Sequence, residues 1–208
     1  DALPIFEAPV ACGLIGHLVS AVSGGNLYRK ASFLVDSAGK TIFPSHISIS
    51  EHPHLKRGLG SSPFDGEGAK TSDRNLVDSG VLTGYVLGSY SARRLGLVPT
   101  GNAGGVNNLT VTKQALSFAQ LVSQMGRGLL VTDLMGFGIN MLTGDYSRGA
   151  SGFWVEDGEI AYPVEEITIA GNLADMFKNI VACAADVDLR GNIRSGSILL
   201  ESLTVAGS

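Results

Sequence analysis

The first clear pattern in the chain is an apolar stripe between residues 8 and 22. Apolar residues recur at positions 10, 14, 18 and 22, with further apolar residues beside them at 15 and 19. This spacing follows the helical repeat and places the apolar residues on one face. Pro9 suits a first helical turn, and Gly24-Gly25 suits the end of a helix. The pattern therefore predicts a helix over residues 8–22.

Shorter segments show the alternation or the short apolar runs that are typical of β-strands. Asp157-Gly158 stands between two such runs and is the strongest hairpin signal in the chain. The predicted strands are 40–50, Val81–Tyr90, Leu109–Thr112, Leu129–Leu134, Phe153–Val155, Glu159–Tyr162, Ile167–Ala170 and Ser197–Ala206.

Three further helices are expected, over Ser89–Leu95, over Ser117–Met125 before Gly126, and from the capping residue Asn172 to about Ala185. A polar, glycine-rich loop is expected at 58–74 and a flexible loop at 100–105, and a glycine-rich stretch runs from Gly136 to Gly152. Several hairpins with a few helices predict an α+β fold, with a mainly antiparallel β-sheet or a distorted barrel and a few packed helices. The absence of an evident linker predicts a single domain over residues 1–208.

Composition narrows the classes of partner. Charged residues make up 16% of the 208 residues, against about 25% in a typical soluble protein. Such a chain either buries much of its surface or covers part of it with a partner. The net charge of −4 and the lack of a basic stripe argue against nucleic-acid binding, although Arg93–Arg94 and Lys56–Arg57 form two small basic points. No apolar run reaches the length of a membrane span, so no membrane partner is expected. Two cysteines far apart in the sequence, Cys12 and Cys183, favour a reducing, cytoplasmic location.

The candidates for catalytic chemistry are weak when taken from residue types alone. Cys12 and His17 could both bind zinc, but five residues turn a regular helix about 140° past one full turn, so the two side chains diverge. His52-Pro53-His54 has no carboxylate or cysteine at zinc spacing, and Ser147 has no histidine near it in the sequence. The glycine loops at 101–105 and 136–138 lack the lysine of a phosphate-binding loop. Binding of an extended peptide to a sheet edge is also compatible with the glycine-rich strands.

Several stretches, in order along the chain, resemble the TldD/PmbA metallopeptidase family over its C-terminal half. They are Gly16–Gly25 running into Tyr28-Arg29-Lys30, Ser62–Asp65, Ser89–Arg93, Thr143–Ala150 with Gly152–Val155, and Ile167–Leu173. The resemblance implies that the N-terminal half of the family is missing, which would explain why the sequence starts abruptly at Asp1.

The resemblance also implies a division of labour between two subunits. In the family a TldD-type subunit carries an HExxxH zinc motif and cleaves peptides, and its partner lacks the motif. Here Cys12, Gly13 and His17 occupy the positions of the first histidine, the glutamate and the second histidine. Loss of the general base and of one ligand predicts no catalytic residue and no metal in this chain, with zinc in the TldD-type partner. The expected role is to hold unfolded peptides during proteolysis or peptide maturation, not the gyrase modulation of an older label.

We further predict that Thr143, Gly144, Asp145, Tyr146, Ser147 and Arg148 face the peptide chamber of such a heterodimer. Asp145 and Arg148 would then orient the substrate or hold the loop through an ion pair. Two alternatives remain from the sequence. One is a free-standing peptide-binding module or homodimer without enzymatic activity. The other is an independent hydrolase that uses Cys12 and His17.

Overall fold

The computed structural model describes residues 1–207 and divides them into two compact units. The first unit comprises Asp1–Leu14, Lys113–Asp188 and the C-terminal segment from Ser195, and the second comprises Ile15–Thr112 and Leu189–Arg194. The boundary falls inside helix α1 (Ala8–Ala21), after Leu14. The expectation of a single domain stays a prediction.

The first unit is built on a seven-stranded sheet with the order β12-β8-β7-β6-β1-β11-β9. Only β1 and β6 run parallel, and every other pair is antiparallel. The strands are β1 (Leu3–Phe6), β6 (Gly128–Met135), β7 (Asp145–Glu156), β8 (Glu159–Asn172), β9 (Ile180–Cys183), β11 (Ile198–Leu200) and β12 (Thr204–Ala206).

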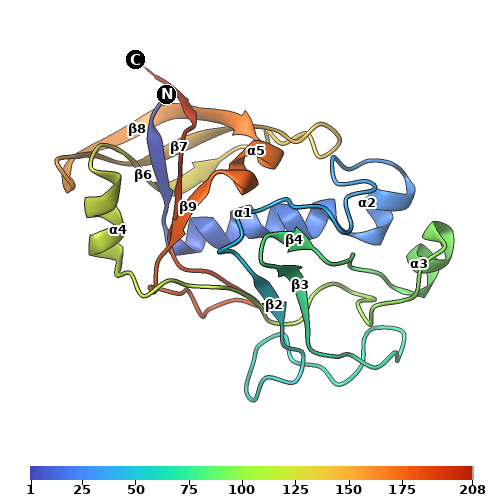
Figure 1. Cartoon of the computed structure of the whole chain (residues 1–208). Coiled ribbons are helices and arrows are strands. Elements are labelled where there is room, and N and C mark those ends of the chain that lie inside the picture. Colours follow the sequence, from blue (N-terminus) through green and yellow to red (C-terminus); the bar gives the residue numbers. More distant parts are fainter. Residues whose placement is uncertain (208) are drawn as a thin grey trace. The chain divides into compact units, whose positions relative to one another are not determined.

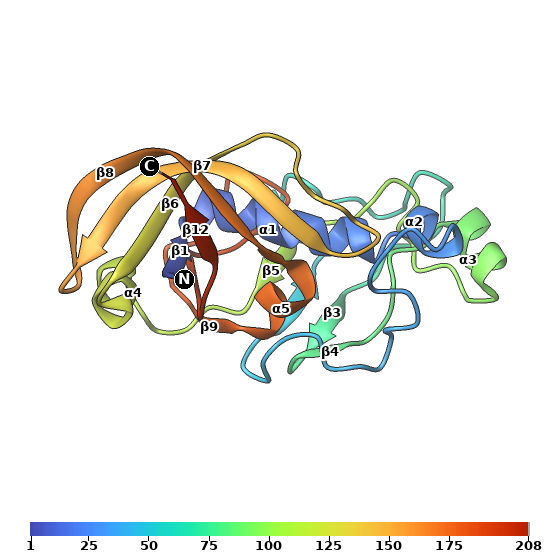
Figure 2. The same ribbon diagram turned by 90° about the horizontal axis from the view of Figure 1, so that it is seen from above.

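The longest feature of this sheet is the hairpin formed by β7 and β8, joined through Asp157 and Gly158, both at positive φ. Figure 2 shows the two strands curving side by side, with β12 along one end of β8. Register shifts interrupt the β7–β8 pairing in two places, and such irregularities bend a strand and increase its twist. The hairpin predicted at Asp157-Gly158 is therefore confirmed.

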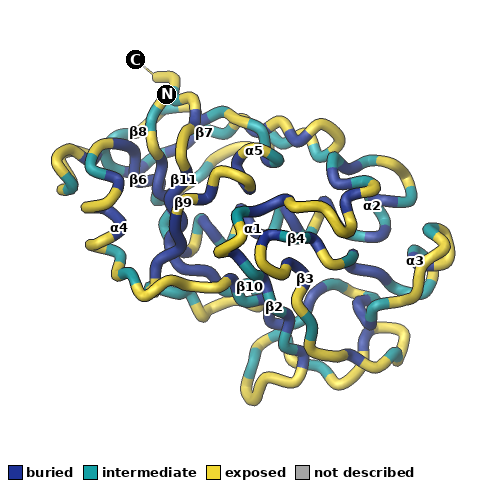
Figure 3. Tube along the Cα trace, viewed as in Figure 1, coloured by how far each residue is buried: buried dark blue, intermediate teal, exposed yellow. Residues whose placement is uncertain are grey.

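Helix α4 (Phe118–Met125) closes the core on one side of this sheet. Its residues Leu121, Val122 and Met125 pack with Ile5, Leu130, Val155 and Leu199 from four different strands. The helix begins with a capping box, in which Ser117 and Gln120 each bond the backbone amide of the other, an arrangement that satisfies two otherwise unpaired donors. The central strands and β9 are largely buried along the chain trace (Figure 3).

The second unit carries a five-stranded sheet with the order β10-β5-β2-β3-β4. Its strands are short: β2 (Ile49–Glu51), β3 (Arg74–Asp78), β4 (Val81–Leu82), β5 (Leu109–Val111) and β10 (Ile193–Arg194). Two short helices, α2 (Gly24–Tyr28) and α3 (Ser89–Leu95), lie beside each other in the same unit (Figure 1). Within residues 1–207 neither sheet closes into a barrel, and the predicted α+β class with mainly antiparallel pairing is confirmed.

The helix predicted from Asn172 to about Ala185 is wrong in its second half. Asn172 caps α5 (Leu173–Lys178) through the amide of Ala174, as expected. The chain then turns into β9, which pairs with β11 and contains the buried Cys183. The β-branched residues Ile180 and Val181 alternate between buried and exposed positions, and pairing with a neighbouring strand outweighs their helical continuation.

The strand predicted over Val81–Tyr90 is also too long, because only Val81 and Leu82 pair with β3. Beyond them, the segment is held by scattered bonds. The side chain of Thr83 donates to the carbonyl of Asn75, Arg74 donates to the carbonyl of Tyr85, and Val86 forms an isolated parallel bridge with Ser23. Strand β1, strand β3 and helix α2 were not predicted, and α2 begins where Gly24-Gly25 indicated only the end of a helix.

Candidate functional site

The three positions of the degenerate zinc motif lie on helix α1, as predicted. Cys12 and His17 are half-buried, and Gly13 is exposed. A Cβ built on Gly13 would meet no atom within 4 Å. Crowding therefore does not explain why a glutamate is absent at this position. Within residues 1–207, no three histidine, cysteine, aspartate or glutamate side chains are grouped so that they could hold a metal ion.

The predicted peptide-facing segment forms the turn into β7 and the start of that strand. Asp145 accepts hydrogen bonds from the Thr143 hydroxyl at 2.6 Å and from the side-chain amide of Asn172 at 3.3 Å. The same side-chain amide donates to the carbonyl of Thr143, and the backbone amide of Leu173 donates to the carbonyl of Gly144. Gly144 has φ of +84°, a conformation that favours glycine. The turn is therefore tied to the beginning of α5.

Strand alternation divides the rest of the segment into two faces. Asp145 and Ser147 are exposed, whereas Tyr146 is 2% exposed and Arg148 is half-buried. Arg148 donates to the carbonyl of Leu134, and its buried Nε has no hydrogen-bond partner among the described residues. Among the described residues no ion pair joins Asp145 to Arg148, since the two charged side chains lie on opposite faces of the strand. Whether the six residues contact a peptide stays a prediction.

Burial of Tyr146 predicts a loss of stability in alkaline solution. Burial raises the pKa of Tyr146 to about 12, although the positive charge of Arg148 opposes the shift. The unfolded chain loses this proton near pH 10 and the folded chain near pH 12, so the stabilisation present below pH 10 is lost as the pH rises between them. We expect the unfolding free energy of the wild-type protein to fall by about 2 kcal/mol more than that of Tyr146→Phe over this interval. Urea denaturation of both proteins at pH 9 to 12 measures the difference, and parallel curves would contradict the prediction.

A cleft of about 410 Å³ in the second unit was missed by the sequence analysis. It is lined by the start of α2, the start of α3, Glu67 and the loop from Asn102 to Gly105. Three of the stretches that carry the family resemblance meet here or directly beside it, namely those ending at Gly25, Asp65 and Arg93. The sequence alone does not show that these stretches lie together, because about 65 residues separate the first stretch from the last.

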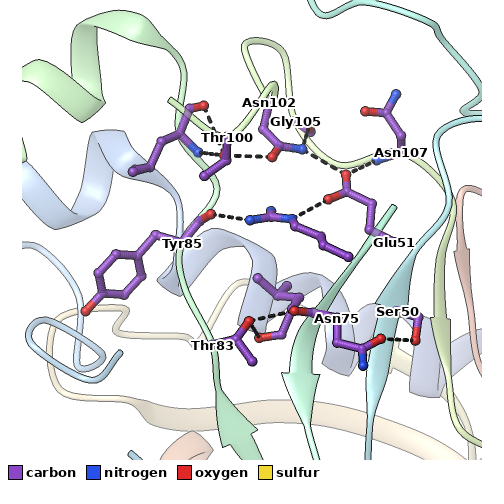
Figure 4. A network of polar contacts seen from close by, with 12 residues as sticks. Ser50, Glu51, Asn75, Thr83, Tyr85, Thr100, Asn102, Gly105 and Asn107 are labelled. Atoms are coloured by element: carbon purple, nitrogen blue, oxygen red, sulfur yellow. Dashed lines mark hydrogen bonds and ion pairs between the residues drawn. The ribbon is translucent and has the colours of Figure 1, made fainter. Parts of the chain in front are cut away.

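One wall of the cleft is held in place by a buried carboxylate (Figure 4). Glu51 is 2% exposed and accepts hydrogen bonds from Arg74 Nε, Asn102 Nδ2 and the Asn107 amide at 2.6–2.8 Å. Asn102 also donates to the carbonyl of Gly105. The network therefore fixes the loop that supplies Asn102, Gly104 and Gly105 to the cleft.

Comparison with known proteins assigns the family. The model of the PmbA/TldA metallopeptidase C-terminal domain matches residues 4–207. The chain belongs to this metallopeptidase family. It is 57% identical to the "Metalloprotease PmbA" of Escherichia coli O157:H7 over 98% of the chain and 45% of that protein. It therefore spans about half the length of the curated relatives it matches.

Solved structures support the same assignment. A protein of Thermotoga maritima, described as a putative modulator of a DNA gyrase, matches 99% of this chain and 49% of its own with a TM-score of 0.90 and 34% identity. TldE from Thermococcus kodakarensis matches 99% of this chain and 50% of its own with a TM-score of 0.86 and 25% identity. The expected resemblance to the TldD/PmbA family is thus confirmed.

The family name implies a metal, and the donor atoms on α1 can be tested against it. A catalytic zinc takes three protein ligands and keeps an open position for water. Here α1 offers one thiol and one imidazole at the motif positions, and Gly13 supplies no side-chain donor. The residues present at these positions do not fit a catalytic zinc site of the PmbA/TldA family.

No helix within residues 1–207 is long and apolar enough to cross a bilayer.

Proposed function

We propose that this chain is part of the non-zinc, TldE-type subunit of a cytoplasmic TldD–TldE-type metallopeptidase. The observation that carries the proposal is the occupation of the motif positions on α1 by Cys12, Gly13 and His17. A zinc-bound water needs ligands to lower its pKa and a base to accept its proton. Without the glutamate and the first histidine, this subunit would leave the chemistry to a TldD-type zinc subunit. Its own role would be to hold unfolded peptides while they are cut.

The connection between β6 and β7 supports a surface that receives another chain. Phe137 is fully exposed, and Met135 and Leu142 in the same segment are each about half exposed. Three exposed apolar side chains within this short part of the chain favour a contact surface here. The loop from Thr143 to Arg148 follows directly, so the predicted peptide-facing residues are adjacent to it in the chain.

Mixing the full-length protein with its TldD-type partner tests the proposal. We expect a stable complex in size-exclusion chromatography, and cleavage of an unfolded peptide that is faster with both subunits than with either one alone. A partner in which the motif glutamate is changed to glutamine is the matched control, since it should still form the complex but cleave no peptide. Absence of a complex, with no change in cleavage, would contradict the proposal. It would instead favour a free-standing peptide-binding module or a homodimer.

A further inference from the structure

The cleft between α2 and α3 is lined partly by the aromatic rings of two tyrosines and partly by glycine backbone. The rings of Tyr28 and Tyr90 meet edge to face, with centroids 5.7 Å apart, and Tyr90 is 60% exposed. Gly104 and Gly105 also line the cleft; they have φ of +107° and +115°, and a Cβ on either would meet no atom within 4 Å. A cleft of this volume with one apolar side and one polar side is typical of a small-ligand site.

Guanidinium groups gather at the aromatic wall. Arg29 and Arg94 both lie over the Tyr28 ring, with their Cζ atoms 5.6 and 5.8 Å from its centroid. Arg29 Nη2 also lies 3.6 Å from the place where a Cβ of Gly25 would be, and Gly25 lines the cleft. Arg29 Nη2 donates to Asn26 Oδ1 at 3.3 Å, and among the described residues neither arginine forms an ion pair. Neither positive charge is therefore balanced by a carboxylate.

The nearby carboxylates are already hydrogen-bonded to backbone amides. Asp65 accepts from the amides of Ala103, Glu67 and Ala69, and Glu67 accepts from the amide of Ser89. The amide of Ala103 lowers the pKa of Asp65, and hydrogen bonds from Ser89 lower that of Glu67. These two carboxylates support the loop and the start of α3. Arg29 and Arg94 therefore place two positive charges at the Tyr28 side of the cleft, in a chain whose net charge is −4.

We propose that this cleft binds a carboxylate of a peptide, with Arg29 as the cation that pairs with it. Guanidinium groups form charge-assisted, often bidentate hydrogen bonds to carboxylates. The side chain next to the carboxylate lies against Tyr28 and Tyr90, and the peptide backbone runs past Gly104 and Gly105. The inference rests on the proposed function only in taking peptides as the ligand class. The carboxylate belongs either to the C-terminus of the peptide or to an acidic side chain.

Three short peptides separate these sources. They are acetyl-Ala-Ala-Phe with a free C-terminal carboxylate, the same peptide as its C-terminal amide, and acetyl-Ala-Glu-Phe amide. Binding to the full-length protein without a partner is measured by calorimetry. We expect at least one of the two peptides that carry a carboxylate to bind about tenfold or more tightly than the neutral amide, the range expected for a hydrogen bond to a charged group. Equal binding of all three peptides, or no saturable binding of any, would overturn the proposal.

Variants identify the cation. Arg29→Ala is expected to remove the preference for the carboxylate, and Arg29→Lys to restore part of it. Arg127→Ala is the matched control, since Arg127 lies over the Trp154 ring at 5.8 Å in the first unit, and it should bind as the wild type does. Unchanged preference in Arg29→Ala, with an unaltered thermal unfolding curve, would overturn the assignment. Failure of complex formation with a TldD-type partner would contradict the proposed function and leave this binding result unaffected.

Discussion

Replacement of Glu51 by alanine is expected to lower the free energy of unfolding by about 3–5 kcal/mol, the cost of removing one partner from a buried ion pair. Arg74 has its Nε 2.8 Å from the Glu51 carboxylate, and its side chain is 20% exposed. The variant would leave this cation without a counter-charge and the Asn107 amide without its acceptor, and Asn102 Nδ2 would keep only its bond to the carbonyl of Gly105. Buried donors without partners add to the cost.

Urea denaturation of the wild type and of Glu51→Ala measures this loss. Asp73→Ala is the matched control, since Asp73 pairs with His52 across 3.5 Å, and both side chains are substantially exposed. An exposed pair contributes about 0–1 kcal/mol, so the control should unfold close to the wild type. A Glu51→Ala protein as stable as Asp73→Ala would show that the network in Figure 4 does not support the cleft loop.

The second large effect is expected at Gly152 in β7. A Cβ on Gly152 would overlap the carbonyl oxygen of Leu130 on the neighbouring strand, and that oxygen is backbone and cannot turn away. The close approach occurs where register shifts bend the pairing of β6 with β7 and of β7 with β8. Gly152→Ala should therefore force the strands apart and cost about 2–3 kcal/mol, the upper part of the usual range for overpacking.

Gly149 provides the matched control in the same strand. A Cβ there would lie 3.5 Å from the Met135 Cβ, which is ordinary contact, and its φ is not positive. Gly149→Ala should be neutral or slightly stabilising because alanine has fewer unfolded conformations to lose. Chemical denaturation of both variants compares them directly. Equal stability of the two would mean that β6 and β7 do not approach each other as closely at Gly152 as the structure places them.

The elements that were predicted correctly from the sequence are those specified by residues close together in the chain. The helical stripe of α1, the capping residues of α4 and the Asp157-Gly158 turn each depend on residues close together in the chain. Strand β1 was missed because it is four residues long and is defined by its pairing with β6 and β11. The end of α5 was misplaced for the same reason, since β9 exists through its pairing with β11.

The candidate site shows the same division. The positions on α1 followed from one helix, and they were correctly placed on it. The cleft in the second unit is lined by Gly25, Gly88 and Gly104, which lie far apart in the sequence. No local sequence pattern predicts that they come together. The expected ion pair between Asp145 and Arg148 failed because an odd spacing along a strand puts the two side chains on opposite faces.

Zinc analysis tests the central claim most directly. The full-length protein, its TldD-type partner and their complex are each freed of loosely held metal, analysed for zinc and assayed for peptide cleavage. We predict that zinc will accompany only the partner, in the isolated state and in the complex, and that this protein alone will cleave nothing. One equivalent of zinc on the isolated protein, together with peptide cleavage that is lost in Cys12→Ala, would contradict the account.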